Sequence, residues 1–395
     1  MDSIRMAQWM LRNRHTGEKD FFCSPLCGAA THKLCLIGTG KTKVIDEKSH
    51  RRTPGFFLFH GYGACGKKGV ELDRDRFADW DERRWDMRPW FMACESDEVN
   101  DRQAELASIL KTVHREEMGS HRRSTFAVPL LRSDCLNLLT ILYAKHPWQE
   151  KMERTSLRFV DGRGEPRSVS GFHGIVHSAR YALWKKDEER SIIRTVRFQV
   201  NGNMMVVCML PTTRTHFLRF KDADELRVPD DRCRGGVIFG PPPSTLALGN
   251  WWKDMEVEDI LRRELDGGGE EEERYETALM HVTLPTLQDS QNENDYMGHL
   301  PHIIDPWQKL VGLYRKDEAP LATEIVAQSY SHVTMDERGV MMRCNAPPSI
   351  PEGGERDERQ AFLPRFCFDT PGLIFFVMKQ HILGVMAWQG KKEEN

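Results

Sequence analysis

The order of helical and strand-like segments along this chain of 395 residues predicts an α+β fold. Apolar side chains recur at helical spacing near the start, over residues 4–12, 24–37 and 101–118. From about residue 136 onward, short apolar segments of strand length dominate and end in a closing pair. Helices and strands that are segregated along the chain in this way are typical of an α+β domain.

The segment at residues 101–118 carries the clearest helix signals. Asp101 is a preferred N-cap residue, and Ala104, Ala107 and Val113 lie on one face at helical spacing behind it. This segment is therefore the helix that the local sequence supports best.

The strand-like segments are short apolar runs bounded by polar residues or glycine. A helix or turn near residues 297–313 follows the earlier strands and leads into residues 321–335, and the closing pair of strands comes after them. We expect the strands at residues 136–143, 157–160, 195–200, 204–210, 280–287, 366–378 and 382–388.

The composition narrows the class of protein and its compartment. The net charge is −3, which argues against a nucleic-acid binder that works by bulk charge. No apolar run approaches the roughly 20 residues of a transmembrane helix, and Arg5, Arg12 and Arg14 interrupt any secretory signal peptide. Ten cysteines lie scattered along the chain, which indicates free thiols in a reducing compartment. We expect a cytoplasmic or nuclear protein.

Two stretches read as loops. Residues 266–274 form a glycine-rich acidic turn with a solvated run of charges. Residues 346–364 combine four prolines, two glycines and six charges between a strand-like segment and the closing pair. So long a connection without regular structure usually has a function inside a compact domain.

Two glycine-rich patterns fall short of a nucleotide site. The sequence GTGKT at residues 38–42 lacks the first glycine of a phosphate-binding loop, because Cys35 stands there. Residues 61–66 spell G-x-G-x-x-G, but a charged and glycine-broken segment follows instead of an apolar helix. We expect no nucleotide cofactor.

Histidine and cysteine clusters do not make a convincing metal site either. His173 and His177 have the spacing of a zinc-binding helix, but Gly174 replaces the glutamate that would activate water. The cluster that includes Cys23, Cys27 and nearby His32 and Cys35 lies in an apolar helical stretch, where cysteine is usually a small buried hydrophobe. We expect no metal, and no catalytic constellation is visible.

The chain resembles the serpin family in six segments that follow the family's order. Their sequence spacing matches as well, whereas residues 50–125 match poorly. The closing segment is most similar to that of poxvirus members. The matching segments are FFCSPL (21–26) with residues 28–40, LLTILYAKHPW (138–148), NGNMMVVCMLP (201–211), MHVTLPTL (280–287), residues 317–339 and residues 366–386.

The resemblance implies a single monomeric domain over residues 1–395, with three β-sheets, about eight or nine helices and an exposed reactive-centre loop. Residues 346–364 fall where that loop should be. In inhibitory serpins a protease cuts the loop, and the segment after the hinge then enters the central sheet as an extra strand.

The hinge departs from the inhibitory pattern. Glu337 and Gly339 match it, but Val340 and the residues that follow it, Met341, Met342, Arg343 and Cys344, replace the usual small side chains. Alternation of side chains leaves Met341, Arg343 and Asn345 free to face solvent, so we expect insertion to be impaired rather than abolished. Pro347, Pro348 and Pro351 follow and lack the N–H that a central strand donates.

The shutter, where the central sheet of a serpin opens, is also incomplete. Ser24 and Pro25 are retained, and Trp148 matches a family tryptophan of the neighbouring breach region. Thr140 and Ser329 stand where the family uses a hydrogen-bonded Asn and His, so we expect a weakened network.

The residue that a protease would recognise depends on where the loop is counted from. Counting forward from the hinge leads to Gly353, and counting back from Pro371 leads to Asp357, which would suit a caspase pocket. Arg356 and Arg359 would suit trypsin-like enzymes, and all these charges are equally consistent with a solvated loop.

Two functions follow from the resemblance. The first is a non-inhibitory or weakly inhibitory, non-enzymatic serpin that binds a host protease or another host protein, as a virus-encoded modulator of host defence would. The alternative is an active suicide inhibitor of a serine or caspase-type cysteine protease through residues 346–364.

Overall fold

The structure is a computed structural model that describes most of the chain in separate ranges. Within them, no helix is long and apolar enough to cross a membrane. The described residues are 2–13, 20–38, 56–66, 87–95, 98–118, 131, 135–161, 165–186, 191–212, 251–266, 273–295, 324–344 and 365–390.

Helices occur where the sequence predicts them at the start of the chain. The three early predictions correspond to α1 (Ser3–Asn13), α2 (Pro25–Gly38) and α3 (Val99–Met118). A short 3-10 helix, η4 (Trp251–Asp254), leads into α6 (Val257–Asp266), whose buried face includes Ile260 and Leu261. The segment at 297–313 lies outside the described residues.

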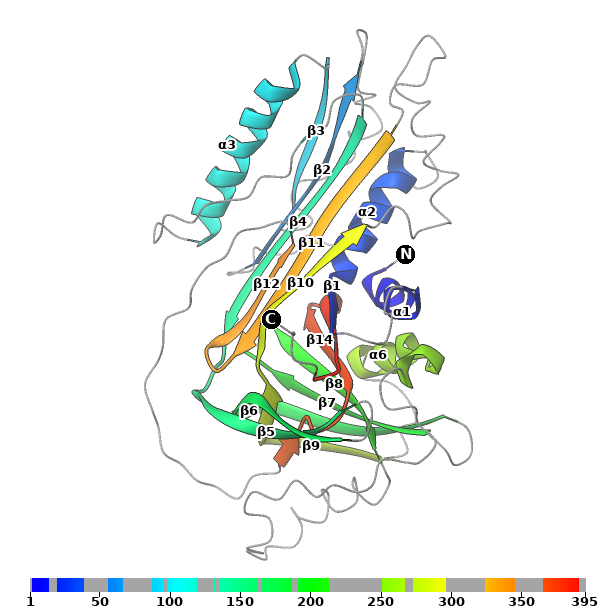
Figure 1. The fold of residues 1–395 in the computed structure, drawn as a ribbon, viewed down its shortest axis with the longest axis vertical. Helices are drawn as coiled ribbons and strands as arrows, with labels where there is room; N and C mark the ends of the chain where they lie inside the picture. The colour runs from blue at the N-terminus through cyan, green and yellow to red at the C-terminus, as the bar shows by residue number, and fades with distance from the viewer. Residues whose placement is uncertain are drawn as a thin grey trace, which may run out of the picture.

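Six strands form a long upright sheet in the upper part of Figure 1. The glycine-rich segment 61–66 lies inside β2, so it does not form the strand-to-helix turn of a dinucleotide site. The strands, in spatial order, are β10 (Leu287–Asp295), β11 (Glu324–Asp336), β12 (Gly339–Cys344), β4 (Cys135–Pro147), β2 (Phe56–Gly66) and β3 (Met87–Glu95).

The other nine strands form a second hydrogen-bonded network. Along its main path the order is β1 (Phe21–Cys23), β15 (His381–Trp388), β14 (Gly372–Met378), β8 (Met205–Thr212), β7 (Ser191–Gln199), β6 (Pro166–Lys186), β9 (Glu273–Pro285) and β13 (Arg365–Cys367), and β5 (Met152–Val160) pairs with β6.

The described strands thus form two networks, whereas the sequence led us to expect three sheets. The reason is β6, a strand of 21 residues that pairs with β5 at one end and with β7 at the other. Its register shifts between His177 and Arg180, and Ser178 between them has a φ of 50°. The bend divides the network into two regions without breaking it.

Residues near the start of the sequence are bound to the β14–β15 hairpin, whose strands are buried throughout except for His381. The main-chain N–H of Ile382 donates to Ser3 Oγ at 2.9 Å, and that of Gln389 donates to Asp20 Oδ1. Strand β1 pairs with β15 alongside these contacts. The hairpin therefore joins both ends of the described chain in one core.

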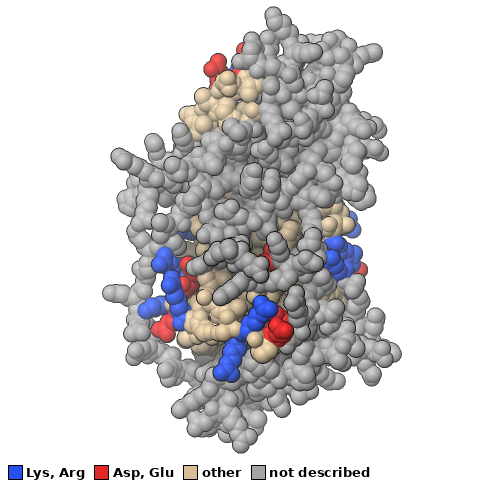
Figure 2. Space-filling view, in the orientation of Figure 1, with Lys and Arg blue, Asp and Glu red and all other residues tan. Residues whose placement is uncertain are grey.

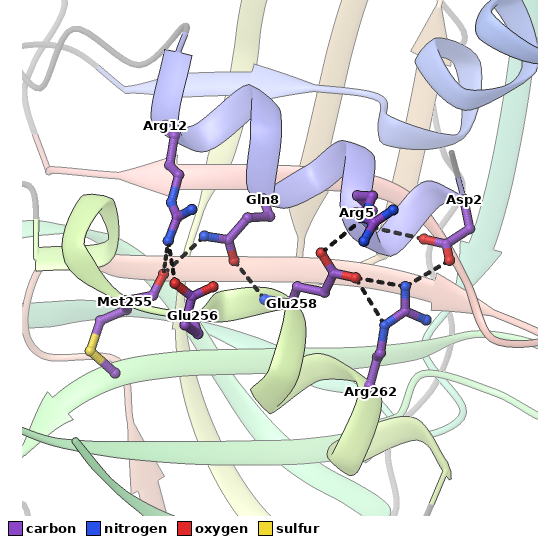
Figure 3. A network of polar contacts seen from close by, with 8 residues as sticks. All are labelled: Asp2, Arg5, Gln8, Arg12, Met255, Glu256, Glu258 and Arg262. Atoms are coloured by element: carbon purple, nitrogen blue, oxygen red, sulfur yellow. Dashed lines mark hydrogen bonds and ion pairs between the residues drawn. The ribbon is translucent and has the colours of Figure 1, made fainter. Parts of the chain in front are cut away.

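Gln8 of α1 completes the N-terminus of α6 (Figure 3). Its Oε1 accepts from the main-chain N–H of Glu258 at 2.7 Å, and its Nε2 donates to the Met255 carbonyl at 3.0 Å. Ion pairs link the exposed rim, where Arg262 contacts both Asp2 and Glu258. Gln8 thus supplies hydrogen-bond partners for main-chain groups at the N-terminus of α6 that have no partner within the helix.

We expect Gln8→Ala to lower the free energy of unfolding by about 1–3 kcal/mol, because it leaves the partly buried N–H of Glu258 without its acceptor. Urea denaturation measures this. Asn13→Ala is the matched control, since Asn13 also bonds a carbonyl from α1 but is exposed. Equal costs for the two variants would contradict the capping role.

Charged side chains of both signs are interspersed on the face seen in Figure 2. The visible Lys and Arg clusters of the described residues each have Asp or Glu beside them. Exposed pairs of this kind contribute little to stability.

Candidate functional site

The hinge segment is a strand inside the six-stranded sheet. β12 lies between β11 and β4, with Gly339 opposite Asp336 and Pro147, and Cys344 opposite Ser331 and Leu142 (Figure 1). Toward the first residues of β11 and β4, at the top of the sheet in Figure 1, these two strands pair directly and in parallel, through residues 324–327 and 135–138. β12 therefore occupies only the lower part of the space between them in this view.

The turn that leads into β12 requires glycine. Asp336 Oδ1 accepts from the main-chain N–H of Arg338 at 2.8 Å, which closes the turn. Gly339 has a φ of 152°, and a Cβ on it would stand 2.5 Å from the His146 carbonyl oxygen. A side chain at this position would meet backbone that cannot move without disturbing β4.

Both faces of β12 are covered. Val340 and Met342 point to one face and Met341 to the other, and their exposed fractions are 1%, 0% and 7%. The expectation that Met341 would face solvent is therefore wrong, because β12 is an interior strand with covered faces. The side chain of Arg343 and the whole of Asn345 lie outside the described part of the chain.

A glycine on the facing hairpin makes room for the large Met342 side chain. A Cβ on Gly384 of β15 would stand 2.9 Å from Met342 Sδ and 2.7 Å from the Phe22 ring. The structure thus accommodates the Met342 side chain, whereas the sequence led us to expect that a large side chain here would oppose insertion of the hinge into the sheet.

Trp148 fixes the turn to the end of β4. Its Nε1 donates to the Asp336 carbonyl at 2.6 Å, and its ring packs against Phe172 and Phe198 at centroid distances of 5.6 and 6.4 Å. Only 8% of Trp148 is exposed. The predicted breach residue therefore contacts the hinge directly.

Glu337 carries the ionic contact of the hinge. Arg154 of β5 donates to Glu337 Oε1 from Nε at 2.9 Å and from Nη2 at 2.8 Å. Burial alone would raise the pKa of Glu337, but the hydrogen bonds and charge of Arg154 outweigh it and lower that pKa. The sequence gives no sign of this partner, which lies 183 residues away.

Two predicted shutter residues, Ser24 and Thr140, form side-chain hydrogen bonds with elements outside the six-stranded sheet. Ser24 Oγ donates to the Leu383 carbonyl at 2.6 Å and accepts from the Cys27 N–H, so it caps α2, which begins at Pro25. Thr140 Oγ1 lies 3.0 Å from Thr31 Oγ1 of α2. The hydroxyl of Thr140 thus has a partner that the sequence did not suggest.

Ser329 lies on β11, opposite Asn294 of β10. The parallel register of β11 with β4 ends at Ala327 and Leu138, two residues before Ser329 and Thr140. These two positions therefore mark the fork where β11 and β4 separate around β12. The side chain of Ser329 lies outside the described part.

The loop itself lies outside the described residues, and with it the bait candidates Gly353, Arg356, Asp357 and Arg359. Its far end is described, because β13 begins at Arg365 and pairs with β9.

A buried ion pair anchors the residues after the loop. Arg194 Nη2 donates to Asp369 Oδ1 at 2.5 Å and to the Cys367 carbonyl at 3.3 Å, and its guanidinium lies 5.5 Å from the centre of the Phe366 ring. Arg194 and Asp369 are 5% and 3% exposed. The only sequence signal was an arginine between apolar residues of a strand.

The predicted zinc pattern is not on a helix. His173 and His177 lie on β6, where Glu153 and Glu150 face them at 3.7 and 3.0 Å. In the ranges that the structure describes, no three His, Cys, Asp or Glu side chains are grouped to hold a metal.

No protein-family model matches this sequence, and no curated protein matches it. Solved structures do match along nearly the full chain. A highly specific serpin of the insect Tenebrio molitor matches with a TM-score of 0.51 and 11% identity, covering 99% of this chain and 97% of its own. A cleaved, loop-inserted ovalbumin matches with a TM-score of 0.54 and 12% identity, covering 97% of each chain.

The chain has the serpin fold. Human thyroxine-binding globulin in complex with thyroxine also matches, with a TM-score of 0.54, 10% identity and coverage of 97% of this chain and 95% of its own. None of these three is named as an enzyme. β12 directly precedes residues 346–364, and Trp148 bonds the turn that leads into β12.

Proposed function

We propose that this serpin-fold protein is non-inhibitory or weakly inhibitory and acts by binding other proteins. The observation that carries the proposal is the direct pairing of β11 with β4 beyond the C-terminal end of β12. A cut loop could enter the sheet further only by separating these two strands. The mechanism by which inhibitory serpins trap proteases would then lack its driving step.

Prolines oppose that separation. The register of β12, if continued, would place residues 345–351 between residues 330–324 of β11 and 141–135 of β4. Pro347, Pro348 and Pro351 fall within this stretch and cannot donate to either neighbour. Each lost bond leaves a buried carbonyl unsatisfied, at a cost of about 1–3 kcal/mol.

Thermal unfolding before and after nicking residues 346–364 tests the proposal. We expect an unchanged midpoint, because the nicked segment cannot extend β12. The variant with Pro347→Ala, Pro348→Ala and Pro351→Ala is the matched control, and nicking should raise its midpoint. A large rise in the unmodified protein would overturn the proposal.

The alternative is a suicide inhibitor of a serine or caspase-type cysteine protease. One observation favours it: β12 already pairs with both neighbours and accommodates Met342. A detergent-resistant complex with a protease would support this function. Its loss in Asp357→Ala would favour a caspase, and its loss in Arg356→Ala or Arg359→Ala would favour a trypsin-like enzyme.

The proposal extends to the setting in which the protein works. An intracellular, virus-encoded modulator of host defence is supported by the resemblance of the closing hairpin to poxvirus members. Among the described cysteines, Cys208 and Cys367 are free thiols, which suits a reducing compartment. Size-exclusion chromatography with light scattering tests the expected monomer.

A further inference from the structure

His146 of β4 lies directly against the hinge strand. Its main chain pairs with Val340, and its carbonyl oxygen is the atom closest to the missing side chain of Gly339. Its ring is 2% exposed and points to the same face as Ala144, which is fully buried. The ring therefore belongs to the layer against which β12 packs.

The polar contacts of the ring fit only its neutral form. His146 Nδ1 lies 3.3 Å from Asn201 Nδ2. Asn201 Oδ1 accepts from the main-chain N–H groups of Asn203 and Met204 at 3.0 and 3.2 Å, which fixes the orientation of the amide. Asn201 thus donates and Nδ1 accepts, so the ring proton is on Nε2. Protonation of Nδ1 would place two donors face to face.

Within the described residues, no counter-charge faces the ring to stabilise its protonated form. On its face of the sheet the neighbours are Val340 of β12 and Met335 of β11, and the segment after β7 contributes the uncharged Asn201. The nearest charged residues in sequence, Lys145 and Glu150, point to the other face or lie beyond the strand. Asp336 is opposite Gly339 at the turn and also alternates to the other face.

The remaining charged groups of the hinge whose side chains the structure describes lie in the turn. Glu337 is held by Arg154, and Arg338 follows it. Nε2 itself is buried and has no hydrogen-bond partner in the part of the chain that the structure describes. Burial alone lowers the pKa of His146 from 6.5 to about 4.

We infer that protonation of His146 loosens β12 from the sheet, so that acid releases the hinge strand. With β12 in place the ring stays neutral, whereas withdrawal of β12 opens its site to water and lets it bind a proton at its ordinary pKa. The released state therefore binds more protons, and acid favours it. The effect begins as pH falls below 6.5 and is complete near 4.

The two pKa values set the size of the effect. The equilibrium for release increases by up to about 30-fold at pH 5 and about 300-fold below pH 4, if the ring becomes fully hydrated. Hydrogen exchange of the amides of residues 339–344, corrected for intrinsic exchange rates, measures this opening between about pH 7.5 and about pH 5.

His146→Gln should remove the response, because glutamine remains neutral and its side chain can still accept from Asn201. Asn201→Asp provides a second, independent variant. Its carboxylate keeps the acceptors for Asn203 and Met204 and places a negative charge beside His146. It should stabilise the protonated ring in place and reduce the loosening.

Glu337→Gln is the control for the other titrating group at the hinge. It should keep the response above about pH 5, because the pKa of Glu337 lies below its usual value. The inference is overturned if His146→Gln responds to pH as the unmodified protein does. It is also overturned if Glu337→Gln alone abolishes the response, or if exchange at residues 339–344 does not change with pH.

Discussion

Asp369→Ala should lower the free energy of unfolding by about 3–5 kcal/mol. Among the described residues, the substitution leaves the buried guanidinium of Arg194 with the Cys367 carbonyl, at 3.3 Å, and the face of Phe366 as its remaining partners. An uncompensated charge in such a site is costly because water cannot replace the lost carboxylate. Urea denaturation measures the change.

The matched control for Asp369→Ala removes an exposed ion pair. Glu105→Ala removes the 2.8 Å ion pair between Arg102 and Glu105, whose side chains are 41% and 48% exposed. We expect it to lower the free energy of unfolding by less than about 1 kcal/mol. The double variant Arg194→Met/Asp369→Leu should recover much of the loss, because no buried charge remains. Similar costs for Asp369→Ala and Glu105→Ala would show that the buried pair is not needed.

Gly339→Ala should also destabilise the protein, by about 2–5 kcal/mol, because strain at a positive φ adds to overpacking. Its Cβ would lie 2.5 Å from the His146 carbonyl oxygen and 2.8 Å from Pro147 Cα, both of them main-chain atoms. Either β4 distorts or β12 leaves the sheet. Denaturation gives the cost, and hydrogen exchange at residues 339–344 tells the two outcomes apart.

Gly202→Ala is the control for this prediction, since a Cβ on Gly202 would meet no atom of the described residues within 4 Å. We expect its effect on stability to stay within about 0.5 kcal/mol. If Gly339→Ala were equally neutral, the close approach of β12 to β4 would be refuted.

Local sequence signals were sufficient for elements whose conformation is determined by residues close to them in the sequence. Apolar side chains at helical spacing over residues 24–37 predicted α2, and the apolar runs at 372–378 and 382–388 are the strands of the closing hairpin. In contrast, β6 was missed. Glycines and histidines interrupt its apolar pattern, and it is a strand because β5, β7 and β9 pair along it.

The site was predictable only in part. The resemblance singled out Trp148, Glu337 and Gly339, and all three lie in or against the turn that leads into β12. The roles of His146 and Arg194 did not follow, because their partners lie 55 and 175 residues away. The burial of Met341 could not be predicted from the sequence either. The alternation of side chains along a strand assigns residues to two faces, but it does not say which face is covered.

The pairing of β1 with β15 has a consequence for how the protein is made. The contacts of Ser3 with Ile382 and of Ser24 with Leu383 span 379 and 359 residues. At ribosomal rates of about 5–20 residues per second, β1 emerges roughly 20–70 s before its partner strand. Throughout translation the apolar face of α1 and β1 must therefore wait without its native neighbour. During that interval the nascent chain exposes apolar segments of the kind that chaperones hold.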